Sequence, residues 1–311
     1  MTGAHLQPWK DWIGRERVTE DTVTLERALK LAATLDADSA GLRKGAPLPA
    51  GWHWTLFHEV VPQSALAADG HERRGDFLPP IALDRRMWAG GRLRFYRALK
   101  IGAPVQRIST VRSVDLKEGR SGPLAFVTVE HRLTDAEGVV LEEEQDLVYL
   151  NRSPAPPMTG STEPAKGAAE DVGRRAGEAE PRARADWSEV VTLDEVALFR
   201  FSALTFNGHR IHYDRPYATE VEHYPDLVVH GPLVALLLLG AGLRWTARDD
   251  RLREENAPVR FQYRALQPLY CNESFELNGT AVEASGSESA VELRAHGTRG
   301  LAMRAELIHA G

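Results

Sequence analysis

The chain has 311 residues, of which 43% are apolar and 26% charged, and it carries a net charge of −6. This composition is typical of a soluble globular protein, and the length predicts two domains of ordinary size. The acidic balance argues against nucleic acid as the main partner, because nucleic-acid binding usually demands a basic face.

Cys271 is the only cysteine, so the sequence excludes an internal disulfide and a metal site built on thiolates. A reducing compartment follows, and we expect a cytoplasmic protein. The first residues, MTGAHLQPWKDWIGRERVTED, lack the basic and apolar segments of a secretory signal. The longest apolar run, PLVALLLLGAGL from Pro232 to Leu243, falls short of the roughly 20 residues that span a bilayer, so no membrane contact is expected.

The first half begins with a strand-like segment and a short helix. The stretch VTLERALKLAATL starts at Val23 and carries Glu26 near the helix start, where the helix dipole favours an acid. Period-2 alternation predicts strands in GPLAFVTVEHRL from Gly122 and in EEEQDLVYL from Glu142. Between these elements, PQSALAADGHERRG allows about two helical turns before Gly70.

Residues 152–186 separate two halves of similar size. This segment is rich in Pro, Ala, Gly and charged residues and has almost no large apolar ones, so it cannot bury enough surface to order itself. We interpret it as a flexible linker between an N-terminal domain, 1–151, and a C-terminal domain, 187–311.

Two short matches relate the halves. VTLDEVALFRFSAL from Val191 resembles VTLERALKLAATL from Val23, at an offset of 191 − 23 = 168. The tetrapeptide YRAL occurs at Tyr96 and at Tyr263, at an offset of 263 − 96 = 167. Two matches at nearly the same offset predict a duplicated domain.

The second half adds a helix that begins near Gly231 and Pro232, residue types that suit a helix start. This helix is apolar nearly all round, so other elements must wrap it. Strands predicted in PVRFQYRAL from Pro258 and LAMRAELIHA from Leu301 can form a curved antiparallel sheet around it. We therefore predict an α+β fold.

The stretch TFNGHRIHYD, from Thr205, concentrates polar side chains just after a predicted helix. His212 is the candidate acid–base residue, because an unperturbed imidazole titrates near pH ~6.5. The Asn207 amide can hold a water molecule or a carbonyl oxygen, and with Gly208 it makes a strong turn pair. A shift by 168 places Asn207 on Ser39, so we expect the chemistry in the second half, with the first half as a roof.

His209 and His212 lie three residues apart, and His223 or His230 could offer a third metal ligand. The sequence has neither the HExxH spacing nor a nearby thiol, so we predict no metal. In VVHGPL, the Gly231 N–H lies at the start of the buried helix, where unpaired backbone N–H groups suit an oxygen that gains negative charge.

The stretch TFNGHRIH resembles the hydratase-2 motif of MaoC-like, hot-dog-fold enoyl-CoA hydratases, whose usual form is Ser/Thr-Gly-Asp-x-Asn-Pro-hydrophobic-His. Asn207 falls on the catalytic aspartate of that motif, His209 on its asparagine and His212 on its catalytic histidine. FSALTFNGHRIHYDRPYA with YPDLVVHGPL, and LPPIALDRRMWAGGRLRF with KEGRSGPLAFVTVEH, are similar to the branch of mesaconyl-C4-CoA (3-methylfumaryl-CoA) hydratase and hydroxyacyl-thioester dehydratase type 2. The likeness covers most of the chain outside the predicted linker.

The resemblance implies a double hot-dog fold, in which each half has a helix gripped by an antiparallel sheet and one active site lies between the halves. It also implies reversible hydration of an enoyl-CoA thioester, without a cofactor or metal. Because Asn207 replaces the aspartate, His212 would perform the proton transfers while Asn207 positions the water and the Gly231 N–H steadies the enolate.

The branch implies mesaconyl-C4-CoA, hydrated to citramalyl-CoA, or a similar short carboxylated acyl-CoA as the substrate. A carboxylated acyl group needs a cation, for which Arg85, Arg86 and Arg210 are candidates, and His209 and His230 are further substrate-binding candidates. Two alternatives stay open: an (R)-3-hydroxyacyl-thioester dehydratase of fatty-acid synthesis, and a non-catalytic acyl-CoA-binding protein. A monomer and a homo-oligomer are equally open.

Overall fold

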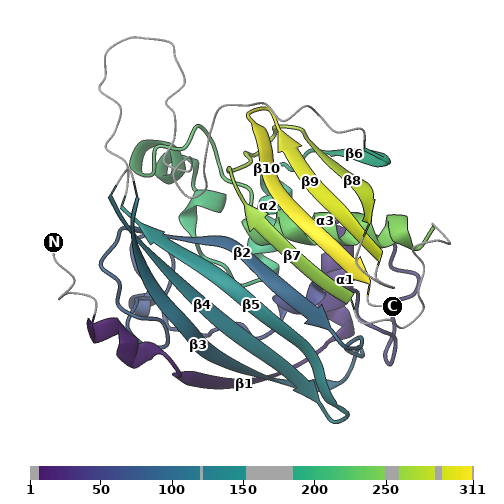
Figure 1. Cartoon of the computed structure of the whole chain (residues 1–311), viewed down its shortest axis with the longest axis horizontal. Coiled ribbons are helices and arrows are strands. Elements are labelled where there is room, and N and C mark those ends of the chain that lie inside the picture. Colours follow the sequence, from purple (N-terminus) through teal and green to yellow (C-terminus); the bar gives the residue numbers. More distant parts are fainter. Residues whose placement is uncertain (1–6, 120–121, 152–184, 249–258, 284–288, 310–311) are drawn as a thin grey trace.

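The computed structural model describes residues 7–119, 122–151, 185–248, 259–283 and 289–309 (Figure 1). The described strands form one antiparallel sheet of ten strands in the order β1-β3-β4-β5-β2-β7-β10-β9-β8-β6. Their bounds are β1 Glu16–Thr22, β2 Arg85–Phe95, β3 Pro104–Gly119, β4 Gly122–Asp135, β5 Gly138–Leu150, β6 Trp187–Val191, β7 Val259–Ala265, β8 Phe275–Glu283, β9 Ser289–Gly297 and β10 Gly300–His309. Short 3₁₀ helices are η2 Gln7–Trp12, η3 Trp52–Thr55, η4 Gln63–Ala65 and η6 Arg210–His212, and a π-helix is η7 Tyr217–Val221. The linker predicted at 152–186 lies almost wholly outside the described residues, so it stays a prediction, as do the domain boundaries.

The order of the strands relates the two halves by an approximate twofold axis. The strands β1-β3-β4-β5-β2 repeat as β6-β8-β9-β10-β7, and β2 pairs with β7 at the centre. The topology therefore agrees with the predicted duplication.

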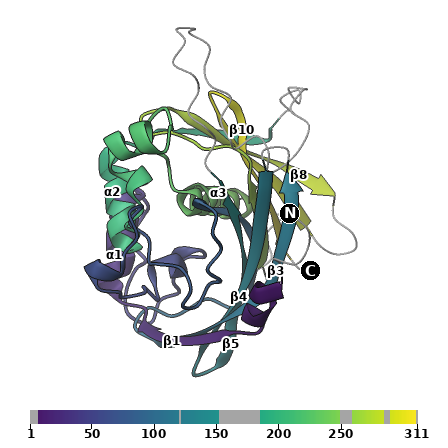
Figure 2. The same ribbon diagram turned by 90° about the vertical axis from the view of Figure 1, so that its left-hand side faces the viewer.

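The α-helices of the described residues are α1 (Leu25–Thr34), α2 (Glu195–Leu204) and α3 (Gly231–Thr246). Helices α1 and α2 correspond in the two halves and lie against each other (Figure 2). Thr24 caps α1 and Asp194 caps α2, and each side chain accepts a hydrogen bond from the backbone N–H three residues on. These caps are 194 − 24 = 170 residues apart, so the VTL match is two residues out of step with the structure.

Helix α3 lies on the concave side of the sheet (Figure 2). It starts at Gly231, as predicted, with a proline in its first turn, where a missing N–H costs nothing. Leu238 and Leu239 are fully buried, and each such side chain contributes roughly 1.5–3 kcal/mol to stability. A Cβ atom added at Gly242 would lie 2.9 Å from the Leu293 side chain of β9, so the helix is in close contact with the sheet.

The first half has no counterpart of α3 among its described residues. An irregular segment that includes η3 packs into the same core as α3 instead. Gly51 in this segment has a φ of 83°, and a Cβ atom there would lie 2.7 Å from the Leu236 side chain of α3. Only glycine combines this backbone conformation with so close an approach. The predicted two helical turns after Pro62 are a single turn, η4, so a long helix gripped by its sheet occurs in the second half only.

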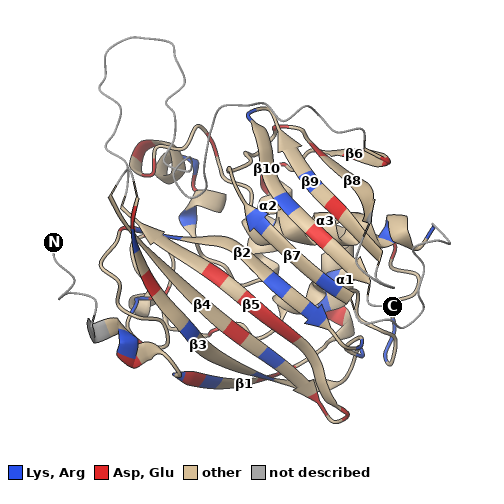
Figure 3. Cartoon of the chain, viewed as in Figure 1, with Lys and Arg blue, Asp and Glu red and all other residues tan. Residues whose placement is uncertain are grey.

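Acidic and basic residues are interspersed along the strands of the sheet (Figure 3). Arg92 on β2, for example, pairs with Glu144 and Asp146 on β5. Such mixed charge suits a surface in contact with water. Among the described residues, no helix has the length and the apolar composition needed to cross a membrane.

Candidate active site

A cavity of about 440 Å³ lies between the two halves, where α3 begins. Both halves line it, with Asp69, His71, Arg86, Trp88 and Arg107 from the first and Asn207, His209, His212, Gly231 and Pro232 from the second. The structure therefore brings together the three residues predicted to be catalytic. It adds side chains from the first half that the sequence did not point to.

The loop after α2 is fixed by hydrogen bonds at the end of the helix. Phe206 has a φ of 50°, and the Asn207 N–H donates to the Ser202 carbonyl at 2.9 Å, which closes the helix. The Asn207 Oδ1 atom accepts a hydrogen bond from the His209 N–H at 3.0 Å. Among the described residues the Asn207 amide nitrogen has no partner, so it can donate to an oxygen in the cavity.

The first half repeats this loop without its polar side chains. Asp36 has a φ of 49°, and the Ala37 N–H donates to a carbonyl of α1 at 2.9 Å. The structural offset of 170 makes Ala37 the counterpart of Asn207, since 207 − 37 = 170, where the sequence shift had chosen Ser39. The first half therefore keeps the backbone conformation of the catalytic loop but lacks its polar side chains.

His212 is a buried imidazole in a fixed tautomer. Its Nδ1–H donates to the Val228 carbonyl oxygen, 2.7 Å away, so the Nε2 atom carries the lone pair. The ring is 7% exposed and lines the cavity. Burial lowers the pKa of His212 to about 4, because a charged imidazolium would lose its hydration there. His212 is therefore a neutral base at physiological pH.

His230 supports His212 from behind. The two rings stack with centroids 3.7 Å apart, and His230 Nε2 lies 2.8 Å from the Ser202 hydroxyl. His230 is completely buried, burial holds its pKa well below the usual range, and its side chain does not line the cavity. The role of His230 in substrate binding stays a prediction, and the structure places His230 against the His212 ring outside the cavity lining.

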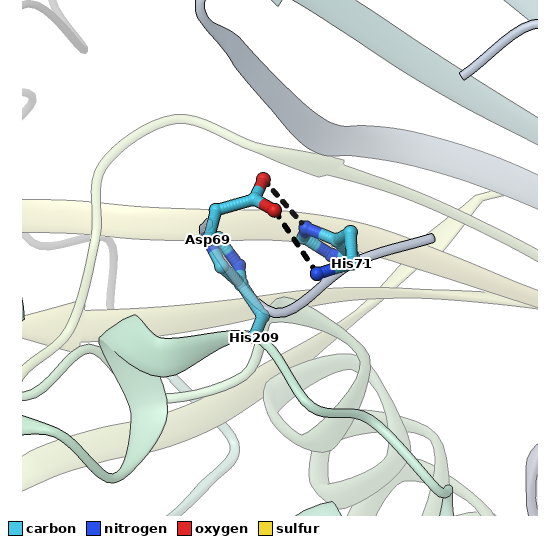
Figure 4. Close-up of side chains that lie close together, drawn as sticks. All are labelled: Asp69, His71 and His209. Carbon is cyan, nitrogen blue, oxygen red and sulfur yellow. Dashed lines mark hydrogen bonds and ion pairs between the residues drawn. The ribbon is translucent and has the colours of Figure 1, made fainter. Parts of the chain in front are cut away.

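Asp69 and His71 reach the second-half histidines from the first half. The Asp69 carboxylate accepts hydrogen bonds from the His71 backbone N–H at 3.0 Å and from its Nδ1 at 3.1 Å (Figure 4). The rings of His71 and His209 lie 4.1 Å apart, and those of His209 and His212 lie 5.4 Å apart. Both halves therefore contribute side chains to the site, whereas the sequence suggested that the first half only covers it.

Two close backbone approaches hold this arrangement. The Arg210 N–H donates to the Asp69 carbonyl at 2.9 Å. A Cβ atom at Gly70 would lie 1.9 Å from the Gly208 carbonyl oxygen, and the φ of Gly70 is +90°. Glycine is required at position 70 both for its conformation and for the contact. The spacing Asp69-Gly70-His71, an acid and a histidine around a turn glycine, was the sequence signal that could have revealed this loop.

The cluster of Asp69, His71 and His209 also bears on the metal question. Their three ligand atoms lie within 4.8 Å of one another. In the structure Asp69 accepts hydrogen bonds from His71. Burial lowers the pKa of both His71 and His209 and so favours their neutral form, which is the form that binds a metal. The prediction of a metal-free site stays a prediction.

The start of α3 presents unpaired backbone donors to the cavity. The Gly231 N–H has no partner among the described residues. A Cβ atom added at Gly231 would meet only the Trp88 carbonyl oxygen, at 3.9 Å, so the backbone is open on that side. An oxygen that gains negative charge can approach this N–H at the positive end of the helix dipole.

The predicted arginines differ in their availability. Arg85 is tied to the buried Glu222 through Nε at 2.7 Å. Arg210 pairs with Asp214 at 2.7 Å and does not line the cavity, so its role in substrate binding stays a prediction. Arg86 lines the cavity, and no carboxylate of the described residues lies within ion-pairing distance of it.

A second cavity, of about 200 Å³, adjoins the first. The two share the side chains of Phe57, Trp88, Arg107, Gln145, Asn207 and Pro232. Its far wall includes a buried acid, Glu143, whose oxygens lie 3.0 Å from His53 Nε2 and 2.9 Å from Trp54 Nε1. The far end of the small cavity is therefore lined by polar groups of the first half.

The chain matches the family model of hydroxyacyl-thioester dehydratase type 2 over residues 51–271. It belongs to that family. A protein of Chloroflexus aurantiacus named mesaconyl-C(4)-CoA hydratase is 43% identical over 293 residues, which cover 92% of this chain and 96% of that protein. The mitochondrial hydroxyacyl-thioester dehydratase type 2 of Schizosaccharomyces pombe is 27% identical, over 86% of this chain and 88% of its own.

The fold is that of the double hot-dog proteins, as predicted. A MaoC-like dehydratase superposes with a TM-score of 0.68 at 17% identity, over 97% of this chain and 99% of its own. A Mycobacterium tuberculosis protein described as having a double hotdog fold gives a TM-score of 0.55 at 13% identity, over 97% of this chain and 98% of its own. The family and its relatives make the protein a hydro-lyase of acyl thioesters, so the non-catalytic alternative is set aside. The cytoplasmic location and the oligomeric state stay predictions.

Proposed function

We propose that the protein hydrates mesaconyl-C4-CoA to citramalyl-CoA and catalyses the reverse dehydration. The observation that carries this proposal is a neutral His212, with its Nε2 lone pair free, in one cavity with the Asn207 amide and the Gly231 N–H. The name of the 43% identical relative supports the choice of acyl group.

The proposed hydration uses one proton carrier. Asn207 holds a water molecule, His212 Nε2 takes one of its protons, and the hydroxyl adds to the β carbon of the enoyl thioester. The π electrons move to the thioester oxygen, where the Gly231 N–H stabilises the enolate. The His212 imidazolium then gives its proton to the α carbon, which restores the neutral base.

The Asp69–His71 pair supplies negative charge beside this step. Hydrogen bonds from His71 hold the pKa of Asp69 well below its usual range, so the carboxylate is ionised. The charge of Asp69 opposes the lowering of the His209 pKa by burial, and the His209 ring contacts both His71 and His212. We therefore assign Asp69 and His71 to the positioning of the histidine cluster that contains the base.

The alternative within the family, dehydration of long (R)-3-hydroxyacyl chains, fits the cavity less well. Besides Arg107, the large cavity is lined by Ser109, His131 and Gln145. Ser109 and His131 hydrogen-bond each other, and Gln145 donates to Glu143. Arg107 contacts no acid of the described residues, so a long alkyl chain would cover its charge without offering it an anion, which costs free energy.

The test is a spectrophotometric assay of mesaconyl-C4-CoA and crotonyl-CoA side by side, with His212→Ala and the control His223→Asn. His223 is exposed, lies outside the cavity and has a φ of 58°, a conformation that asparagine tolerates. We expect preferential hydration of mesaconyl-C4-CoA and a loss of at least about 100-fold in His212→Ala, with an unchanged circular dichroism spectrum. A preference for crotonyl-CoA would contradict the substrate, and an active His212→Ala would contradict the mechanism.

A further inference from the structure

Arg107 lies at the junction of the two cavities and has no counter-ion. It projects from β3, and it borders both the large and the small cavity together with Asn207. No carboxylate of the described residues lies within ion-pairing distance of its guanidinium, and its buried Nε atom has no hydrogen-bond partner among them. Its one hydrogen bond goes from Nη2 to the Phe57 carbonyl at 3.3 Å, and its charge lies over the Phe57 ring, 4.8 Å from the centroid.

The acids around Arg107 are committed to other groups. Glu143 accepts hydrogen bonds from His53, Trp54 and Gln145, which hold its pKa near 2. Glu59 pairs with Arg17. Both acids affect Arg107 only at a distance, and burial lowers the pKa of Arg107 because its charge is poorly solvated. A buried cation without a contacting anion is costly, so such a site favours an anionic ligand.

The chemistry of the proposed substrate provides that anion next to the reacting carbon. In mesaconyl-C4-CoA the free carboxylate is bonded to the β carbon, the atom that receives the hydroxyl. A receptor for the carboxylate must therefore border the same space as Asn207, which positions the water. Arg107 borders both cavities together with Asn207. Arg86 borders only the large cavity with Asn207.

We propose that Arg107 binds the free carboxylate of the acyl group and selects carboxylated enoyl thioesters over uncharged ones. This inference rests on the proposed function and names the residue that sets its specificity. The planar guanidinium can donate two parallel hydrogen bonds to a carboxylate, which a lysine cannot match.

The experiment compares kcat/KM for mesaconyl-C4-CoA and crotonyl-CoA in the wild-type enzyme, Arg107→Met and Arg107→Lys. The control is Arg112→Met on the same strand, where an exposed arginine pairs with Glu130. We expect the ratio of the two kcat/KM values to fall at least about 100-fold in Arg107→Met and by less in Arg107→Lys, because removing one partner of a buried charge pair is costly. The ratio should not change in Arg112→Met.

Unfolding by urea provides a readout that does not depend on turnover. Removing an unpaired buried charge should leave Arg107→Met at least as stable as the wild type, whereas loss of a structural arginine would lower its stability.

Three outcomes would overturn the inference. A wild-type enzyme that hydrates mesaconyl-C4-CoA but keeps its selectivity in Arg107→Met would refute the role of Arg107 and leave the proposed function intact. Loss of selectivity in Arg86→Met but not in Arg107→Met would assign the carboxylate to Arg86. A wild-type enzyme that hydrates crotonyl-CoA alone would refute the proposed function and the inference together.

Discussion

The pH dependence of kcat tests whether His212 is the base. Burial lowers the pKa of His212 to about 4, and only the neutral imidazole can take a proton from water. At pH 5 a base of pKa about 4 is about 90% unprotonated, whereas an ordinary histidine of pKa about 6.5 would be only about 3% unprotonated. We therefore expect kcat to stay near its plateau down to about pH 5 and to fall through about pH 4.

The groups that surround His212 explain why its pKa is lowered. His230 stacks on it, His209 meets it edge-on, and burial keeps both of them neutral. His71 lowers the pKa of His212 further, and only the hydrogen bond to the Val228 carbonyl opposes these effects. No carboxylate of the described residues contacts the ring, so nothing there stabilises the imidazolium directly.

The assay should measure kcat at saturating substrate between pH 3.5 and 8, at constant ionic strength. The CoA phosphates titrate near pH ~6 and would distort kcat/KM, but not the rate of the saturated complex. Activity recovered after return to pH 7 controls for unfolding, and His223→Asn controls for exposed histidine. A fall of kcat with an apparent pKa near 6.5 would refute the assignment of the buried His212 as the base.

Three further predictions concern the surroundings of the base. Ser202→Ala removes the hydroxyl next to the Nε2 atom of His230, so urea denaturation should show a loss of about 1–3 kcal/mol in the free energy of unfolding, and an unchanged midpoint would contradict the role of this hydrogen bond. Gly70→Ala places a Cβ atom 1.9 Å from a carbonyl oxygen of the catalytic loop, so kcat should fall far more than in the control Gly45→Ala, where φ is +84°, a Cβ atom meets nothing within 4 Å and the residue lies outside both cavities. Burial lowers the pKa of His131 to about 4, so below pH 6.5 the unfolded chain binds more protons than the folded one, and the free energy of unfolding falls as the pH is lowered. Between pH 7 and pH 5, His131→Gln should therefore lose about 2 kcal/mol less of its free energy of unfolding than the wild type, as measured by urea denaturation.

Short sequence motifs were enough to predict the site residues that lie on a single loop or at the start of a single helix. Asn207, His209 and His212 share a turn whose geometry depends on its own side chains and on the end of α2, so a short motif can specify it. The start of α3 at Gly231 is equally local. The offset of 168 between the halves was wrong by two residues at the helix caps, which lie 170 residues apart.

Residues that act through tertiary contact could not be found in this way. His71 lies far from His209 in the chain, and the packing of Gly70 against Gly208 is what joins their loops. Arg85 is paired with Glu222, which lies far away in the chain, so this pairing could not be predicted from the sequence. Asp214, by contrast, lies only four residues after Arg210, and this pair could have been predicted. The lack of a counter-ion at Arg107 is a property of the fold.

The unequal halves determine how many substrate molecules the enzyme can hold. A symmetric duplication would offer two equivalent reaction centres, one at each end of the β2–β7 seam. In this chain the loop that follows α1 keeps the backbone of the catalytic loop but carries Ala37 in place of the amide. Within the described part of the first half, no long helix presents N–H donors to the cavity. Calorimetric titration with a substrate analogue should therefore give a stoichiometry of one ligand per chain.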